Sequence, residues 1–394
     1  LRAAILQPAV VAEQKDLKIV FSPIHGTGGV ISVPVLREIG FNALTVPEQD
    51  REDGLFPTVK SPNPENAEAL SMAMELARKE KADLVIGTDP DCDRMGVAVR
   101  NRAGELVLLT GNQIGSLLTY YRCRTYKQLG ILNDHNQRRG VIIKTLVTTD
   151  LQKAIAQREG LHCVETLTGF KYIGAKLRKY EEALPDSVRK SYRGLSEEES
   201  RKARLQYSHF FVFGGEESYG YSGADFVRDK DANGATLMFA EVAAYAKSQG
   251  LTLDELLDKI YLEYGYYSEQ SGSLVFEGAE GAEKIRRLAD SYNRTPPKEA
   301  NGVRVSQVQD FASGEIRDSE GDLLPKEKMT MFDLADGCKI AVRPSGTEPK
   351  IKFYLFGKRE GLDQQTLPAA KQDLKGSLNR LWEWLQTDAK ARVG

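Results

Sequence analysis

Short apolar runs alternate with helical patterns along the first two thirds of the chain, and this alternation limits the possible folds most. Residues 17–23 predict a buried strand, and residues 30–40, after a glycine-rich turn, predict a helix. Residues 41–47 predict the next strand, residues 62–82 a long helix, and residues 83–91 a third strand. This β-α-β-α-β order is typical of a mostly parallel sheet that is covered by helices.

The same order returns further along the chain. Alternating strands and helices are predicted in turn for residues 140–149, 150–160, 161–167, 168–182 and 209–215. The sequence therefore predicts an α/β fold with two similar, mostly parallel domains. The polar stretch 122–139 between them is expected to be irregular. The densely charged stretch 181–206 is expected to be a solvated helical insertion or a mobile loop.

The last third has a different character and predicts a smaller α+β domain with an antiparallel sheet. Strands are expected at residues 271–278, 302–311 and 339–346, and residues 374–392 predict a closing amphipathic helix. A chain of 394 residues is too long for one ordinary core. The expected domains are residues 1–130, 131–265 and 266–394.

The composition argues against several classes of protein. The formal net charge is −2, which gives no reason to expect binding to nucleic acid or to an anionic membrane. No apolar run is long enough to span a bilayer. The scattered cysteines (Cys92, Cys123, Cys163, Cys338) suggest neither a disulfide framework nor a zinc site, and we expect a cytoplasmic protein. The chain begins with Leu1, so it is expected to be a processed product or a fragment.

Residues 87–99 (GTDPDCDRMGVAV) place Asp89, Asp91 and Asp93 two residues apart, directly after an apolar strand. Three like charges need a counter-charge, and hard carboxylate ligands suit Mg²⁺ or Ca²⁺. An EF-hand is excluded, because Arg94 and Arg100 occupy the sixth and twelfth places of the loop. The alternative is an acidic surface turn. Since an arginine cannot ligate a cation, Arg94 is expected to face an anion that shares the metal.

Two further loops carry polar groups at strand ends. In residues 214–221 (GGEESYGY), Glu216 and Ser218 could bind sugar hydroxyls, or the loop could be a capped turn. Residues 343–354 (RPSGTEPKIKFY) offer donors that suit phosphate, unless they form a plain hairpin loop. These donors are Arg343, Ser345, Gly346 and Thr347.

Several single residues give weaker signals, and their roles have alternative interpretations. His25 could touch an anion or could brace a turn, and Arg228 and Lys230 are by default charged surface. Cys92 is a bystander in the acidic loop, because carboxylates outcompete a neutral thiol for a hard cation.

Taken together, the loops DPDCDR, GEESYG and RPSGTEPKIKFY resemble those of the α-D-phosphohexomutase superfamily, the phosphoglucomutases and phosphomannomutases. Further stretches are similar to those of the branch that holds the long-chain phosphoglucomutases and phosphopentomutases. These stretches are VPEQ…FPTVKSPNPE, ETLTGFK and DKDANGA. The resemblance implies a last domain like the TATA-box-binding protein. It also implies a first domain with a phosphoserine in a Ser-His-Asn-Pro-type loop. Ser208-His209-Phe210 is the nearest string here and lies in the wrong context, so that N-terminal domain is expected to be missing.

The resemblance implies a Mg²⁺-dependent phosphoglucomutase that interconverts sugar 1-phosphate and sugar 6-phosphate, with glucose 1,6-bisphosphate as intermediate and activator. Such an enzyme would be an intramolecular phosphotransferase and a phosphoprotein of carbohydrate metabolism, and the fragment alone is expected to be inactive. Mg²⁺ would bind Asp89, Asp91 and Asp93, and Arg94 would support the phosphoserine. The substrate contacts would be Thr168, Gly169, Glu216, Ser218, Lys230, Arg343, Ser345, Gly346 and Thr347.

Several alternatives remain at this point. The substrate could be a mannose or pentose phosphate, as in a phosphomannomutase or phosphopentomutase. The chain could be a Mg²⁺ phosphatase with Asp89 as nucleophile, although the sugar and phosphate loops would then be unexplained. It could also be a non-catalytic fragment that binds sugar phosphates or the missing domain of the same protein.

Overall fold

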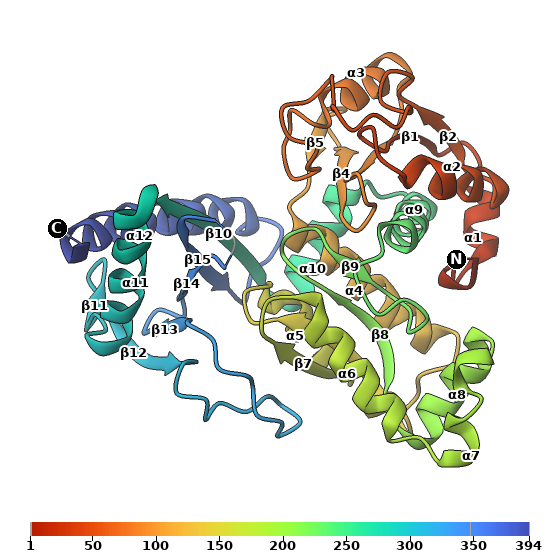
Figure 1. Cartoon of the computed structure of the whole chain (residues 1–394). Coiled ribbons are helices and arrows are strands. Elements are labelled where there is room, and N and C mark those ends of the chain that lie inside the picture. Colours follow the sequence, from red (N-terminus) through yellow and green to blue (C-terminus); the bar gives the residue numbers. More distant parts are fainter. Residues whose placement is uncertain (1, 347, 394) are drawn as a thin grey trace. The chain divides into compact units, whose positions relative to one another are not determined.

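The computed structural model describes residues 2–346 and 348–393, with the side chain of Ala279 left aside. The chain forms two compact units (Figure 1). The first unit contains residues 1–148 and 152–260, and the second contains residues 149–151 and 261–394.

The first unit begins with a sheet in the order β2-β1-β3-β4-β5. Its strands are β1 (Lys18–Ser22), β2 (Asn42–Thr45), β3 (Leu84–Thr88), β4 (Met95–Arg100) and β5 (Leu106–Leu108). β1 pairs in parallel with β2 and β3, while β4 and β5 extend the sheet antiparallel. The chain passes from β1 through α2 (Gly28–Glu38) to one neighbour, and then through α3 (Ser71–Lys79) to the other. In such an order, ligands bind at the carboxyl ends of the strands where the direction of winding reverses.

A second sheet in the first unit repeats this plan in the order β7-β6-β8-β9. Its strands are β6 (Gly140–Thr145), β7 (His162–Thr166), β8 (Phe210–Gly215) and β9 (Tyr221–Ser222). β6 pairs in parallel with β7 and β8, and α5 (Asp150–Arg158) and α6 (Phe170–Glu182) make the crossovers. In each of the two sheets, the carboxyl ends of three parallel strands therefore lie at one edge of that sheet.

Two long helices of the first unit are buried on nearly all sides. They are α4 (Gly111–Gln128), which begins with a capping box of Thr110 and Gln113, and α9 (Ala232–Ser248). Short helices η1 (Arg2–Ala4) and α1 (Pro8–Glu13) precede the first sheet, η2 (Gln137–Arg139) precedes β6, and α10 (Leu253–Tyr264) follows α9.

The charged stretch between α6 and β8 is folded. It forms α7 (Asp186–Arg189), η3 (Tyr192–Gly194) and α8 (Glu197–Tyr207). Leu184, Tyr192 and Ala203 form a small buried cluster there. The helical expectation is confirmed, but the stretch is not wholly solvated.

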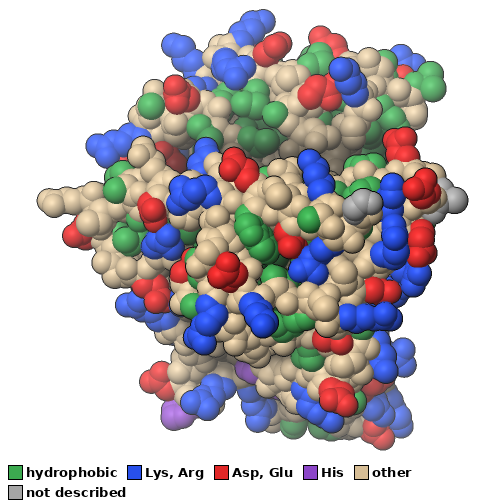
Figure 2. Space-filling view, turned by 90° about the vertical axis from the view of Figure 1, so that its left-hand side faces the viewer, with side chains coloured by type: hydrophobic (Ala, Val, Ile, Leu, Met, Phe, Trp, Pro, Cys, Tyr) green, Lys and Arg blue, Asp and Glu red, His purple; other side chains and the backbone are tan. Residues whose placement is uncertain are grey.

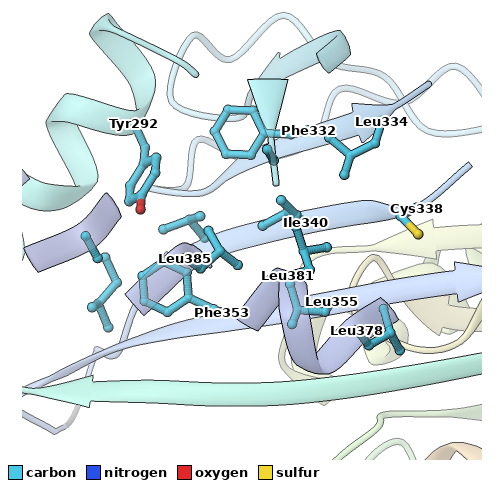
Figure 3. Close-up of a cluster of buried hydrophobic side chains, with 14 of the residues drawn as sticks. Tyr292, Phe332, Leu334, Cys338, Ile340, Phe353, Leu355, Leu378, Leu381 and Leu385 are labelled. Carbon is cyan, nitrogen blue, oxygen red and sulfur yellow. The ribbon is translucent and has the colours of Figure 1, made fainter. Parts of the chain in front are cut away.

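The second unit is an antiparallel sheet with helices on one face. The order is β10 (Tyr266–Val275), β15 (Lys350–Arg359), β14 (Lys339–Pro344), β13 (Thr330–Leu334), β12 (Val303–Asp310) and β11 (Glu299–Ala300). α11 (Gly278–Arg294) and α12 (Leu367–Val393) complete it. Figure 3 shows Tyr292 and Leu385 from the helices packed with Phe332, Ile340 and Phe353 from the strands.

The predicted fold class, two α/β layouts followed by an antiparallel α+β unit, is confirmed. Two details were wrong. The stretch 122–139 is helical as far as Gln128, because Arg122 and Tyr126 are buried side chains of α4. The predicted helix 62–82 is helical only from Ser71 to Lys79, after a series of turns.

The charged side chains on the surface and the apolar character of the helices can be compared with the sequence. Basic and acidic side chains are interspersed over the face shown in Figure 2, and the chain has near-equal numbers of the two. Among the described helices, none combines the length and the apolar character needed to cross a membrane.

Candidate active site

The three aspartates of the β3–β4 loop come together. Carboxylate oxygens of Asp89, Asp91 and Asp93 all lie within 4.8 Å of one another. The loop curls because Oδ1 of Asp89 accepts hydrogen bonds from the backbone N–H groups of Asp93 (3.0 Å) and Arg94 (2.9 Å). Cys92 reverses the chain with a φ of 58°. This loop offers a divalent cation three hard oxygen ligands at one point.

The electrostatics of the loop also suit a cation. Burial raises the pKa of Asp89 to about 7, and the neighbouring Asp93 and Asp91 contribute to the rise, while the N–H of Arg94 opposes it. Crowded carboxylates favour a shared counter-charge.

Two cationic side chains already face this loop. Nε of Arg94 lies 3.9 Å from Oδ2 of Asp89 and 3.7 Å from Oδ1 of Asp93. The ammonium group of Lys230 forms an ion pair with Asp93. A cation bound to the carboxylates would compete with both side chains and leave them available to an anion.

The loop of residues 214–221 is joined to the aspartate loop through backbone contacts. Arg94 and Gly220 form an isolated β-bridge, and the N–H of Met95 donates to the carbonyl of Tyr219 over 3.0 Å. The side chain of Lys230 packs over Gly220, where a Cβ would lie 2.4 Å from Cδ of Lys230. Residues from both α/β layouts thus meet at one place.

Glu216 is held at this meeting point. It is 6% exposed, and its Oε1 accepts a hydrogen bond of 2.8 Å from the N–H of Gly169. Burial raises the pKa of Glu216, while the N–H of Gly169 and then the charges of Lys230 and Arg94 act in the opposite direction. The carboxylate therefore lies within electrostatic range of both cations.

The end of β7 supplies the remaining groups of this site. Oγ1 of Thr168 is buried and has no hydrogen-bond partner among the described residues. Gly169 follows with a φ of 121°, a conformation that favours glycine. Ser218 is half-buried on the 214–221 loop. A polar ligand could satisfy Thr168 as well as Glu216.

The loop predicted to bind phosphate lies in the second unit, after β14. The guanidinium of Arg343 forms an ion pair with Glu327. The N–H of Ser345 donates to the carbonyl of Lys350 over 2.9 Å, and Oγ of Ser345 accepts from the N–H of Glu348 over 3.2 Å. The space around Gly346 is open, and Thr347 lies outside the described residues. The contact with Glu327 was not predicted from the sequence.

Comparison with known proteins now decides the family. Two family models match: the phosphoglucomutase/phosphomannomutase alpha/beta/alpha domain II over residues 3–104, and domain III over residues 110–264. The chain belongs to the phosphoglucomutase/phosphomannomutase family. It is therefore a member of the α-D-phosphohexomutase superfamily, as the loops suggested.

Individual relatives agree with this family. A phosphoglucomutase of Staphylococcus aureus strain USA300 is 34% identical over 355 residues, which are 89% of this chain and 58% of the relative. That of strain MRSA252 matches to the same extent. The chain thus spans 58% of the length of these relatives.

Solved structures of family members share the fold. A phosphoglucomutase (parafusin) of Paramecium has a TM-score of 0.59 at 17% identity, over 95% of this chain and 59% of that one. A phosphomannomutase of Thermus thermophilus has a TM-score of 0.56 at 18% identity, over 94% of this chain and 66% of that one. These likenesses concern the fold.

The remaining candidate residues of this phosphohexomutase chain, His25, Cys92 and Ser208, have contacts that stabilise the local structure. His25 braces a turn, with Nδ1 3.2 Å from the carbonyl of Arg51 and Nε2 2.8 Å from Oγ1 of Thr58. Burial raises the pKa of the Cys92 thiol to about 12, which keeps it neutral. Oγ of Ser208 donates to the carbonyl of Tyr180.

One residue that the sequence did not single out also lies at the aspartate loop. Oε1 of Glu65 is 3.6 Å from Nη1 of Arg94. Its only sequence signal was its place in the PNPE stretch, which read as the start of a helix.

Proposed function

We propose that this chain carries the metal and sugar sites of a phosphohexomutase that interconverts a hexose 1-phosphate and a hexose 6-phosphate through a bisphosphate. The observation that carries the proposal is the convergence of Asp89, Asp91 and Asp93 beside Arg94 and Lys230. Carboxylates that gather a cation, next to cations that can bind an anion, are the parts that phosphoryl transfer requires.

The proposed metal site is the aspartate loop. Asp89, Asp91 and Asp93 would hold Mg²⁺, which supplies neutralisation of charge on the transferring phosphoryl group. Arg94, already directed at this loop, would bind a phosphoryl oxygen through its guanidinium.

The proposed sugar site is formed by Glu216, Ser218, Thr168, Gly169 and Lys230. Glu216 would accept hydrogen bonds from sugar hydroxyls, and its bond to the N–H of Gly169 fixes the carboxylate for that role. The buried hydroxyl of Thr168 would gain the partner that it lacks among the described residues. Lys230 would bind the substrate once a metal ion takes its place beside Asp93.

Arg343, Ser345, Gly346 and Thr347 are proposed to bind the phosphate that does not react. That phosphate would have to displace Glu327 from Arg343, because the two side chains form an ion pair. Glucose phosphates are the proposed substrates, since the curated relatives are named phosphoglucomutases.

The phosphoserine is proposed to lie outside this sequence. The chain covers 58% of its relatives, and the only serine beside a histidine, Ser208, is engaged with a backbone carbonyl. This chain would then supply the metal, sugar and phosphate sites to a domain that carries the nucleophile.

The test is a phosphorus NMR time course with glucose 1-phosphate, a trace of glucose 1,6-bisphosphate and Mg²⁺. The full-length product of the gene should form glucose 6-phosphate, and Asp91→Asn in that protein should abolish the conversion. This chain alone should leave glucose 1-phosphate unchanged. Unaltered turnover by the Asp91→Asn protein, or no conversion by the full-length protein, would refute the proposed function.

A further inference from the structure

Glu65 lies at the aspartate loop but has no part in the proposed function. It belongs to the turns that precede α3, and its side chain is 34% exposed. Its Oε1 is 3.6 Å from Nη1 of Arg94. This contact brings the segment before α3 to the candidate active site.

A close approach of two segments fixes the place of Glu65. A Cβ on Gly96, in β4, would lie 2.4 Å from the carbonyl oxygen of Pro64 and 2.8 Å from its Cβ. Pro64 is buried, and the N–H of Glu65 donates to Oδ1 of Asn63 over 3.0 Å. The turn before Glu65 is therefore packed on β4, only two residues along the chain from Arg94.

The guanidinium of Arg94 lies between two sets of carboxylates. Its Nη1 faces Glu65, while its Nε lies 3.9 Å from Oδ2 of Asp89 and 3.7 Å from Oδ1 of Asp93. These distances are longer than hydrogen bonds, and the side chain of Arg94 makes no hydrogen bond to another described residue. The position of this guanidinium therefore depends on the balance of charge between the two sides.

A cation at the aspartates would change this balance. Mg²⁺ bound to Asp89 and Asp93 would offset the negative charges that attract Arg94 from that side. Among the described residues, three carboxylates pair with this guanidinium, and only that of Glu65 lies outside the aspartate loop. Glu65 would therefore keep its attraction for Arg94 when a metal ion is bound.

Glu65 also acts on the loop of residues 214–221. Burial raises the pKa of Tyr219 to about 12, and the charge of Glu65 adds to this rise. The carbonyl of Tyr219 accepts a hydrogen bond from the N–H of Met95. The carboxylate of Glu65 is thus within electrostatic range of the place where the two loops meet.

We propose that Glu65 is a positioning residue for Arg94, an inference that rests on the proposed function. Its carboxylate draws the guanidinium away from Asp89 and Asp93, so that Mg²⁺ meets less competition there. It then keeps the guanidinium beside the metal, where Arg94 donates to a phosphoryl oxygen. A carboxylate repels such an oxygen, so Glu65 acts through Arg94 and not on the substrate.

The first test is a double-mutant cycle on Mg²⁺ affinity, measured by calorimetric titration of this chain. In Glu65→Gln, Arg94 keeps only the aspartates as charged partners and pairs with them more often. Mg²⁺ binding should then weaken about threefold, as suits an ion pair between partly exposed side chains. In the Arg94→Met background, Glu65→Gln should have no effect, because the competing guanidinium is gone.

The matched control is Glu68→Gln. It removes the same charge from the same segment, and a glutamine can still accept from the N–H of Lys60, as Glu68 does over 3.1 Å. It should leave the Mg²⁺ affinity unchanged. A loss from Glu65→Gln that persists in the Arg94→Met background would mean that Glu65 acts on the metal directly. That result, or equal affinities of Glu65→Gln and the wild-type chain, would overturn the proposal.

The second test uses steady-state kinetics of the full-length protein. Glu65→Gln should lower kcat for glucose 1-phosphate about tenfold and change KM by less than about twofold, because Arg94 is misplaced while the sugar contacts remain. Glu65→Asp, which keeps the charge, should recover part of kcat. An unchanged kcat in Glu65→Gln would overturn the proposal. Absence of turnover by the wild-type protein would instead refute the proposed function, and the Mg²⁺ cycle would still decide the role of Glu65.

Discussion

Lys230 and Asp93 form an ion pair that joins the aspartate loop after β3 to the segment between β9 and α9. Both side chains are mostly buried, at 19% and 26% exposed. Each comes from a different α/β layout of the first unit. The pair therefore places an ammonium group between the proposed metal ligands and the proposed sugar site.

Removing the ammonium group of Lys230 should strengthen the binding of Mg²⁺. In Lys230→Met, Asp93 loses the cation that competes with Mg²⁺, so we expect Mg²⁺ affinity to rise about fivefold. Calorimetric titration of the chain with Mg²⁺ measures this. Lys202→Met, which removes a lysine paired with Glu198 on the exposed face of α8, should leave the affinity as it is. A weaker Mg²⁺ affinity in Lys230→Met would contradict the competition.

Asp91→Asn tests the metal site with little risk to the fold. Asp91 is the most exposed of the three aspartates, so its loss should cost the free energy of unfolding almost nothing. Removing one charged oxygen ligand should weaken Mg²⁺ binding about tenfold or more. Asp134→Asn, on an exposed turn outside the site, is the control. If the titration curves of the two variants coincide, the metal site lies elsewhere.

The aspartate loop depends on a close approach at Gly26. A Cβ on Gly26 would lie 2.2 Å from Cα of Pro90, a backbone atom that can move only with the loop. Gly26→Ala should therefore lower the free energy of unfolding by about 1–3 kcal/mol and weaken Mg²⁺ binding. Denaturant titration and calorimetry measure the two effects.

Gly54→Ala is the matched control for that substitution, because a Cβ at Gly54 meets no atom within 4 Å. It should match the wild-type chain in both measurements. Equal behaviour of the two variants would show that the loop does not need the approach of Gly26 to Pro90.

The curled aspartate loop could be predicted from the sequence because its signal is local. Aspartates at alternate positions after a buried strand indicated a curled loop, and their carboxylates do converge. The contact between Lys230 and Asp93 could not be predicted from residues alone, because the two are separated by more than a hundred positions and Lys230 reads as surface charge.

Buried helices and buried charged residues were the features that sequence patterns predicted least well. α9 is apolar on nearly every side, so it shows no clear stripe of the kind that marks a surface helix. The stretch 181–206 is rich in charge, and composition suggested solvation. Arg204 is nonetheless buried, because Tyr192, Leu177 and Asp225 supply partners from three separate segments.

Glu241 provides a test of how pH affects stability. It is fully buried on α9, and its Oε1 accepts from the N–H groups of Leu6 (2.7 Å) and Gln7 (2.5 Å). Burial raises the pKa of Glu241 from 4.5 to about 7, against those hydrogen bonds, the hydroxyl of Tyr121 and the charge of Arg122. The folded chain therefore holds a proton that the unfolded chain releases between these pH values.

Stability should consequently fall as pH rises from about 4.5 to about 7, and stay level with respect to this group above that range. Glu241→Gln keeps an amide oxygen for Leu6 and Gln7 but cannot ionise. At pH 8 it should be more stable than the wild-type chain by up to about 3 kcal/mol, and nearly equal below pH 4.5. Urea unfolding across this pH range measures the difference. A constant difference at all pH values would mean that Glu241 does not titrate in the folded chain.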